Sequence, residues 1–207
     1  GVGLATRHDW TGWTDDGALR FALPDGKVQL VRPDATLLAL GGASWPRLGG
    51  NGLWLPLLAD RGVPCRPFAP SNSGVEIVWS DVFRDRFEGE PLKRIALSCA
   101  GRRVRGEALV TRRGLEGGAV YALSEPLRQA LGASGSAVVC LDLRPDLTLT
   151  ELAGRLAAPR LKQSTSTFLR KAASLPPVAI ALLRESGGAP LPMAAYALAD
   201  LIKSVPL

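Results

Sequence analysis

The sequence predicts an α/β part followed by a β-rich domain with appended helices, and three observations carry this prediction. A short apolar run at 35–40 ends in a glycine pair, as a strand buried on both faces does before a turn. Short strand-like segments separated by turn residues follow between 74 and 143. Helix signals, which begin with a capping box, fill most of the remainder.

Four strands are expected in the first part, ahead of the apolar run. Residues 1–7 form a short strand, and three segments of alternating polarity follow it at 9–14, 18–23 and 27–31. Turn sequences containing Asp, Pro and Gly separate these segments. The expected order is therefore a strand, a three-stranded meander and then the buried strand.

The glycine pair after the buried strand at 35–40 is a candidate phosphate site. Gly41 and Gly42 leave the backbone bare, and a helix that Asn51 can cap and Gly62 can close follows them. At this edge of open α/β sheets, ligand phosphates bind free N–H groups. The alternative is that the two glycines only form a tight turn.

The segment 66–73 is rich in Pro and Ser and marks a domain crossing. Beyond it, five strands are expected at 74–79, 92–99, 102–110, 119–123 and 137–143. Five short strands at this spacing suggest a small barrel or a curled sheet.

Four helices are expected after this sheet. Thr148 and Glu151 form a capping box for the first helix, which Pro159 breaks. Caps and breakers indicate three more: one capped by Ser164 or Ser166, one opened by Pro177 and ended by Gly187-Gly188, and one at 193–204 with Leu198, Leu201 and Ile202 on one face.

The order of the first elements resembles the second half of the FAD-binding domain in the two-dinucleotide-domain flavoproteins. In those proteins a strand of the form G-V-x-L-x-T precedes a meander and a glycine turn, as the segment 1–6 does here. The resemblance implies that Trp10 lies where a backbone segment contacts the adenine. It also implies that the cofactor pyrophosphate lies near the turn formed by Gly41, Gly42, Ala43 and Ser44.

Three motifs resemble those of one branch, the BaiN/RdsA-like flavoproteins, also called the YhiN family. The motif G-G-x-S-x-P-x-x-G is matched at 41–49, G-E-x-x-x-T-x-x-G-x-x-G at 106–117, and (I/L)-D-L-x-P-D at 141–146. Two departures stand out: many members have His where Arg112 stands and Ser-Gly-Pro at 116–118. Any role tied to that histidine is therefore not assigned here.

The G-x-G-x-x-G fingerprint of a dinucleotide site is not found, and in the family it lies upstream of the elements seen here. The resemblance therefore implies the middle of a longer enzyme, with most of the FAD contacts elsewhere and little activity in this chain alone. The implied domains are the trailing part of the FAD-binding domain at 1–66, an inserted domain at 67–190 (barrel-like at 74–143, helical at 148–190), and the first helix of the return at 191–207.

Composition limits the other classes of function. With 46% hydrophobic and 21% charged residues the chain is typical of globular proteins. No apolar run reaches the roughly 18 residues of a membrane span, and no signal peptide is seen, so a cytoplasmic protein is expected. Three scattered cysteines, Cys65, Cys99 and Cys140, are expected to be reduced, and with His8 as the only histidine neither a catalytic triad nor a metal site is expected. No catalytic residue is assigned.

Charge is the remaining signal, because Lys and Arg number 25 against 19 Asp and Glu and the isoelectric point is near 9.7. The excess lies in the second part, where five residues are candidate nucleic-acid contacts: Arg102, Arg103, Arg105, Arg112 and Arg113. The alternative is a solvated outer face of the sheet.

The family resemblance implies an FAD-dependent oxidoreductase, with NAD(P)H as donor, that reduces an activated C=C bond. Family members include enzymes that reduce a uridine of large-subunit rRNA to dihydrouridine, and a basic inserted domain suits such a substrate. A small steroid-type enone is the alternative substrate. A non-enzymatic basic RNA-binding module is the alternative without catalysis. The oligomeric state is not assigned.

Overall fold

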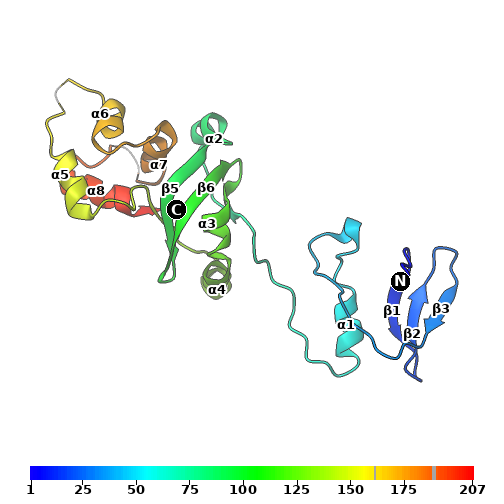
Figure 1. Cartoon of the computed structure of the whole chain (residues 1–207). Coiled ribbons are helices and arrows are strands. Elements are labelled where there is room, and N and C mark those ends of the chain that lie inside the picture. The colour runs from blue at the N-terminus through cyan, green and yellow to red at the C-terminus, as the bar shows by residue number, and fades with distance from the viewer. Residues whose placement is uncertain (161, 188–189) are drawn as a thin grey trace. The chain divides into compact units, whose positions relative to one another are not determined.

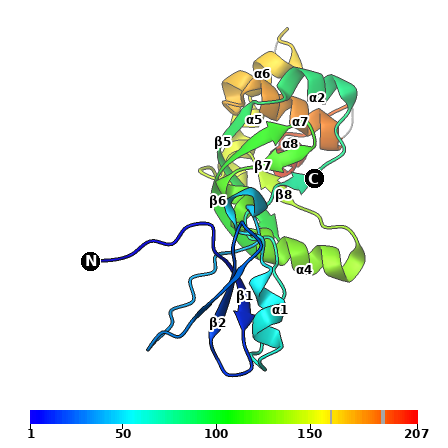
Figure 2. The same ribbon diagram turned by 90° about the vertical axis from the view of Figure 1, so that its right-hand side faces the viewer.

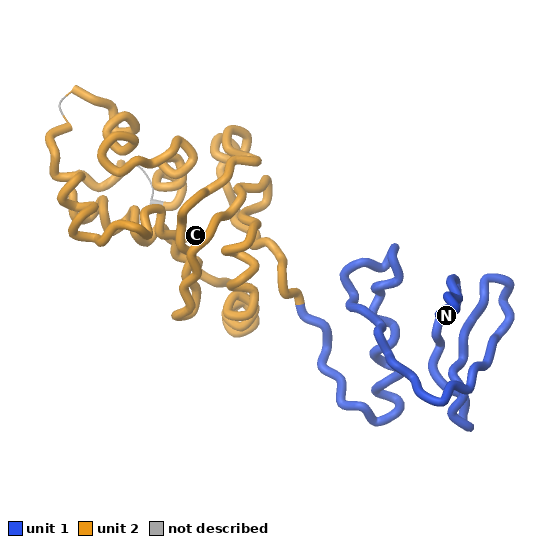
Figure 3. Tube along the Cα trace, in the orientation of Figure 1, with its two compact units in different colours: residues 1–69 blue, residues 70–207 orange. Residues whose placement is uncertain are grey.

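The computed structural model (Figures 1 and 2) describes residues 1–160, 162–187 and 190–207 and divides the chain into two compact units (Figure 3). Unit 1 is Gly1–Ala69 and unit 2 is Pro70–Leu207. Gly188, which was expected to help end a helix, lies outside the described residues. Within the described ranges, none of the helices is long and apolar enough to cross a membrane.

Unit 1 contains the predicted meander, which is confirmed. Its three antiparallel strands are β1 (Asp9–Trp13), β2 (Leu19–Ala22) and β3 (Val28–Val31). In the first turn the Thr14 N–H donates to the Ala18 carbonyl at 2.9 Å, and the Gly17 N–H donates to the Thr14 carbonyl at 3.0 Å. The turn places Gly17 at a φ of 85°, which explains why glycine follows the two aspartates there.

The rest of unit 1 is a 3₁₀ turn at Pro46–Leu48 and the short helix α1 (Trp54–Ala59). The Asn51 side-chain oxygen accepts the Leu53 N–H at 3.1 Å, so Asn51 fixes the turn before α1 instead of capping the helix directly. Gly62 follows the helix end with a φ of 74°, as a residue that closes a helix does.

Two predicted strands of unit 1 are wrong. Residues 1–7 and 35–40 belong to no sheet in the described part of the chain. The run at 35–40 was expected to be buried on both faces, but Leu37 is 93% exposed; Val2 in the first run is 99% exposed. A strand needs a neighbour for its N–H and C=O groups, and no described segment of unit 1 pairs with either run.

Unit 2 is built around a six-stranded antiparallel sheet with the order β4-β7-β6-β5-β8-β9. The long hairpin of β5 and β6 forms its centre (Figure 1). The register between these two strands shifts between Leu92 and Ile95, where Arg94 has a φ of 53°. Such a bulge bends a strand and increases its twist, in keeping with the curled sheet that was expected. The strands are β4 (Val75–Glu76), β5 (Pro91–Cys99), β6 (Arg102–Thr111), β7 (Gly114–Glu116), β8 (Cys140–Asp142) and β9 (Val205–Pro206).

Helices pack around this sheet, and several predicted caps are confirmed. Thr148 and Glu151 form both bonds of the capping box, Ser164 accepts the Thr167 N–H at 3.2 Å, and Pro177 opens its helix. The helices are α2 (Asp81–Phe87), α3 (Gly118–Tyr121), α4 (Ser124–Ser134), α5 (Leu149–Leu156), α6 (Thr165–Ala172), α7 (Pro177–Gly187) and α8 (Ala195–Lys203).

The strand predicted at 119–123 is wrong, because this run lies in α3 and the turn that leads into α4. Ala119, Val120, Leu123 and Leu127 are all buried, which is helical spacing that becomes visible only when the window extends into the next helix. The strands predicted at 74–79 and 137–143 are each shorter in the structure, where β4 has two residues and β8 has three. Helices α2 and α4 and strands β7 and β9 were not predicted.

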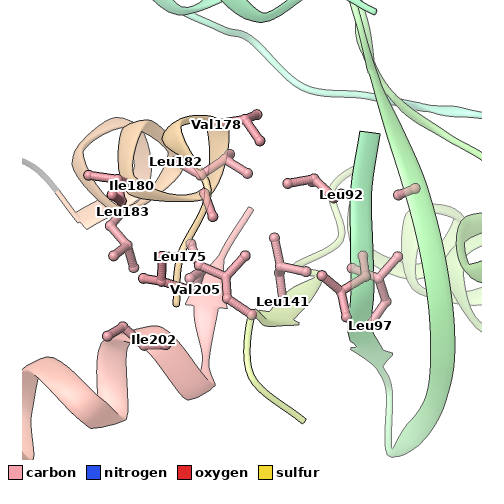
Figure 4. Close-up of a cluster of buried hydrophobic side chains, with 14 of the residues drawn as sticks. Leu92, Leu97, Leu141, Leu175, Val178, Ile180, Leu182, Leu183, Ile202 and Val205 are labelled. Carbon is pink, nitrogen blue, oxygen red and sulfur yellow. The ribbon is translucent and has the colours of Figure 1, made fainter. Parts of the chain in front are cut away.

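The core of unit 2 lies between the sheet and the C-terminal helices (Figure 4). Ile95, Ala96 and Leu97 of β5 are each at most 2% exposed, so the central strand is covered on both faces. Figure 4 shows Leu141 of β8 and Leu182 of α7 among the packed side chains. Val205 of β9 is also fully buried, and β9 pairs with β8, so the segment 191–207 forms part of this core.

Candidate functional site

The glycine turn expected at the cofactor lies on the surface of unit 1. Gly41 has a φ of 70°, and its carbonyl accepts the Trp54 indole N–H at 3.2 Å. Gly42 does not have a left-handed backbone, and a Cβ built on it meets no atom within 4 Å. The backbone conformation therefore favours glycine at Gly41, whereas a side chain at position 42 would meet open space.

The residues after this glycine offer free backbone donors. Among the hydrogen bonds of the described residues, none uses the N–H of Gly42, Ala43 or Ser44 as donor. The next residue, Trp45, closes a small loop with Gly50 through bonds of 3.2 and 3.0 Å in the two directions. A short run of exposed N–H groups held by a closed loop is chemically suited to phosphate oxygens.

Trp10 lies in the second position of β1, opposite Phe21 of β2, and its ring meets that of Trp13 edge to face at 4.7 Å. Its indole N–H is buried and has no hydrogen-bond partner in the described structure. No hydrogen bond between described residues joins Trp10 to the turn at Gly41. The structure thus brings Gly41 to Trp54, and it leaves the Trp10 indole as an unsatisfied donor.

The glycines of the motif at 106–117 have a structural explanation. Gly114 has a φ of 150°, and a Cβ there would lie 1.9 Å from the Val75 carbonyl oxygen. A Cβ on Gly106 would lie 3.3 Å from the Cβ of Ala119. These glycines therefore allow β4 and α3 to approach β7 and β6 closely.

The motif at 141–146 contains a buried carboxylate. Asp142 is 2% exposed and accepts the Arg144 N–H at 2.9 Å. The Asp142 carboxylate also lies 2.5 Å from a guanidinium nitrogen of Arg103 and 2.8 Å from the ammonium nitrogen of Lys203. This carboxylate therefore joins β6, β8 and α8.

Four of the five arginines that were candidate nucleic-acid contacts are paired with carboxylates. The pairs are Arg103 with Asp142, Arg105 with Asp146 at 3.3 Å, Arg112 with Glu88 at 3.3 Å, and Arg113 with Glu76. Arg102 forms no such pair with the residues that the structure describes. A neutralised guanidinium attracts a polyanion less than a free one, so this set of arginines is a weaker candidate than the sequence suggested.

A pocket that the sequence did not predict lies between α2, α6 and α7 and has a volume of about 390 Å³. We call it the arginine pocket. Three helices contribute one guanidinium each, and hydroxyls and one carboxylate lie beside them. The polar lining residues include Arg86, Arg170, Arg184, Ser166, Thr167 and Glu185.

Cysteine and histidine chemistry offers no second site. Cys65, Cys99 and Cys140 are free thiols, and burial raises the pKa of the Cys99 thiol, with a smaller contribution from Cys140. The ring nitrogens of His8 contact the Thr6 carbonyl at 2.7 Å and the Gln29 side chain at 3.0 Å. Residues 1–160, 162–187 and 190–207 contain no cluster of three His, Cys, Asp or Glu side chains suited to a metal ion.

Comparison with known families gives one match. A family model described as "HI0933-like protein barrel and H2TH domain" matches residues 69–207, which span unit 2. No curated protein matches the chain. The matched range contains the motifs at 106–117 and 141–146, and the family is one of flavoproteins of the oxidoreductase type. Because the match covers more than half of the chain and contains two of the three motifs, the chain belongs to the HI0933-like family, the flavoprotein family that its BaiN/RdsA-like motifs indicated.

Proposed function

We propose that this chain is part of an FAD-dependent oxidoreductase that reduces an activated C=C bond with electrons from NAD(P)H. Membership of the HI0933-like flavoprotein family, matched over residues 69–207, carries the proposal. Under it, residues 1–66 are the trailing part of the FAD-binding domain, residues 67–190 are an inserted domain, and residues 191–207 lead back to the cofactor domain.

The residues of unit 1 fit a contact with the cofactor. The unused N–H groups of Gly42, Ala43 and Ser44 suit the oxygens of a pyrophosphate, and the unsatisfied indole N–H of Trp10 suits an acceptor on a ligand. When bound, the flavin supplies the hydride chemistry. The chain's own residues at this turn would hold the phosphates and set the position of the cofactor.

Exposed apolar side chains on unit 1 also support a larger cofactor domain. Leu37 is 93% exposed, Leu48 82%, and Trp45, which lies next to the proposed phosphate turn, 70%. Soluble domains seldom leave this many large apolar side chains uncovered in one small unit. Under the proposal, other parts of the FAD-binding domain cover them.

For the substrate, we propose a uridine in large-subunit rRNA. Addition of a hydride and a proton across the C5=C6 bond of uridine gives dihydrouridine, and the nicotinamide donor is oxidised. The net charge of +6 and the isoelectric point near 9.7 favour a polyanionic substrate over a neutral one.

One observation favours the alternative of a small enone. The Ser124 hydroxyl is buried without a hydrogen-bond partner in the described residues. Ser124 lines a pocket of about 330 Å³ whose lining is mostly apolar but also includes Ser73, Glu76 and Arg128. An unsatisfied donor beside apolar side chains suits a ketone oxygen. In this case the pocket, and not the basic surface, would hold the substrate.

The rRNA of cells that lack the gene tests the substrate. Mass spectrometry of nuclease fragments should show that one dihydrouridine of the large-subunit rRNA has reverted to uridine, and that a plasmid copy of the gene restores it. An unchanged dihydrouridine content in the deletion strain would exclude rRNA as the substrate and leave the enone alternative.

A further inference from the structure

The arginine pocket gathers three cationic side chains, one from α2 and two from the consecutive helices α6 and α7, which come much later in the sequence. Figure 2 shows α2, α6 and α7 together at one end of unit 2. Each helix places two lining residues four positions apart, which is the spacing of neighbours on one helix face. These pairs are Val82 with Arg86, Ser166 with Arg170, and Ile180 with Arg184.

These three guanidinium groups are not neutralised. In the described ranges, no carboxylate oxygen forms an ion pair with Arg86, Arg170 or Arg184. Arg184 donates to the Ser166 hydroxyl oxygen at 3.0 Å, and the Arg86 guanidinium lies 5.3 Å from the centre of the Phe87 ring. All three side chains are exposed at the pocket, so their charge is available to a ligand.

The one carboxylate in the pocket is already used. Glu185 accepts the Ser80 hydroxyl at 2.9 Å and also the Ser80 N–H. Ser80 is the N-cap of α2, so the negative charge lies at the positive end of that helix. The pocket therefore keeps an excess of positive charge.

The floor of the pocket is apolar. Phe83 and Ile180 contribute buried side chains at 3% and 4% exposure, and Val82 at the rim is 78% exposed. A ligand that fits this arrangement carries anionic oxygens beside a flat or apolar moiety. A nucleotide unit of a nucleic-acid strand has both, because its phosphate lies next to a ribose and a base.

We infer that the arginine pocket binds phosphate groups of an RNA strand, an inference that rests on the proposed reductase of rRNA and locates its RNA contact on α2, α6 and α7. Guanidinium groups bind phosphate oxygens through two parallel hydrogen bonds, and the Ser166 and Thr167 hydroxyls add further donors. Arg86, Arg170 and Arg184 are exposed, so a strand that runs over the surface can reach them with its phosphates.

The test compares two variants of the whole chain with the same loss of charge. The pocket variant is Arg86→Gln, Arg170→Gln and Arg184→Gln, and the control variant is Arg105→Gln, Arg112→Gln and Arg113→Gln, whose arginines are paired with carboxylates. Affinity for a fluorescein-labelled single-stranded RNA is measured by anisotropy over a range of salt concentrations.

The pocket variant should bind RNA more weakly, and the slope of log affinity against log salt should fall by about two units, since a single strand loses about 0.7 for each phosphate contact. The control variant should keep a slope close to that of wild type. Equal curves for the two variants, or a pocket variant that binds like wild type, would overturn the inference.

A second pair of variants guards against a fold defect in the triple variant. Arg170→Glu changes a residue that lines the pocket, whereas Lys171→Glu changes the next residue of α6, which does not line it. Both substitutions change the charge equally on an exposed part of one helix. Arg170→Glu should weaken RNA binding about tenfold or more, and Lys171→Glu should weaken it much less. An equal effect of the two would contradict a specific pocket.

Competitors separate RNA from other anions, and flavin assays separate this inference from the proposed function. Unlabelled RNA should displace the probe, and polyglutamate of equal charge should not; displacement by polyglutamate that depends on Arg170 would point to an acidic protein and overturn the RNA assignment.

RNA binding requires no flavin. A pocket variant that binds RNA like wild type therefore defeats this inference alone, whereas a gene product without bound flavin defeats the reductase.

Discussion

Lys203, at the end of α8, places its ammonium nitrogen 2.8 Å from the carboxylate of Asp142 in β8, and both side chains are largely buried. The same ammonium donates to the carbonyls of Arg144 and Leu147 at 2.9 and 2.6 Å. Asp142 is the first of the two acidic residues of the L-D-L-x-P-D motif. This ion pair ties the last helix to the sheet, which gives the motif a role in holding unit 2 together.

Loss of the buried carboxylate should destabilise unit 2 strongly. Asp142→Ala leaves the Lys203 charge without its carboxylate, and removal of one partner of a buried pair costs about 3–5 kcal/mol. Asp146→Ala is the control, because the Asp146 side chain is 57% exposed and pairs only with the exposed Arg105. Urea denaturation should show a loss of about 1 kcal/mol or less for the control. Similar losses for both variants would contradict the structural role of Asp142.

Substitution of Arg103 should destabilise unit 2 more than substitution of its neighbour Arg102. Arg103 contacts the buried Asp142 at 2.5 Å, whereas Arg102 has no carboxylate partner among the described residues. Thermal unfolding should show a lower melting temperature for Arg103→Ala and an almost unchanged one for Arg102→Ala. The reverse order would show that this ion pair contributes nothing to stability.

The two glycines of the proposed phosphate turn should respond differently to valine. Gly41→Val forces a branched side chain into a left-handed backbone and should cost about 1–3 kcal/mol of stability. Gly42→Val meets open space and should leave the fold intact, but its Cβ would stand in the way of a bound pyrophosphate. Flavin content and melting temperature of the protein from the complete gene separate these effects. Full flavin occupancy in Gly42→Val would show that the pair forms only a tight turn.

The capping box of α5 predicts a dependence of stability on pH. Hydrogen bonds from the Thr148 N–H and hydroxyl lower the pKa of the Glu151 carboxyl. Because the pKa is lower in the folded state, the Glu151 carboxylate stabilises the fold fully near neutral pH, and this stabilisation is lost as the pH falls through the folded-state pKa. The melting temperature of Glu151→Gln, measured as a function of pH, should therefore fall less steeply at acid pH than that of wild type. An equal fall in the two proteins would rule out a contribution from Glu151.

Thr148→Ala tests the same cap without a titrating group. Substitution of a threonine N-cap costs about 0.5–2 kcal/mol, so urea unfolding should show a loss of that size. Thr150→Ala is the control, because Thr150 is the second residue of α5 and its side chain does not cap the helix. Equal losses would place the effect outside the cap.

Features that depend on neighbouring residues could be predicted from the sequence. The meander and the box of Thr148 and Glu151 are local, because turn glycines and caps act within a few positions. The run at 119–123 was misassigned because five apolar residues fit a buried strand as well as a helix. The strand expected at 35–40 needed a neighbour to pair with, which no local pattern reveals.

The candidate sites also differ in how far the sequence predicts them. The glycine turn could be found from its motif, since consecutive residues form it. The arginine pocket could not, because the fold brings Arg86 of α2 beside Arg170 and Arg184, which lie much later in the sequence on α6 and α7. The arginines of β6 and of the turn after it looked available in the sequence, and only the fold shows the carboxylate partners of four of them.

The visible absorption spectrum of the purified product of the complete gene, recorded before and after anaerobic addition of NAD(P)H, tests directly whether the protein is a flavin-dependent oxidoreductase. The protein should show the absorption band of an oxidised flavin in a roughly equimolar amount, and the band should disappear when the donor is added. A colourless protein that binds RNA through the arginine pocket would contradict the oxidoreductase and leave a basic RNA-binding module in its place.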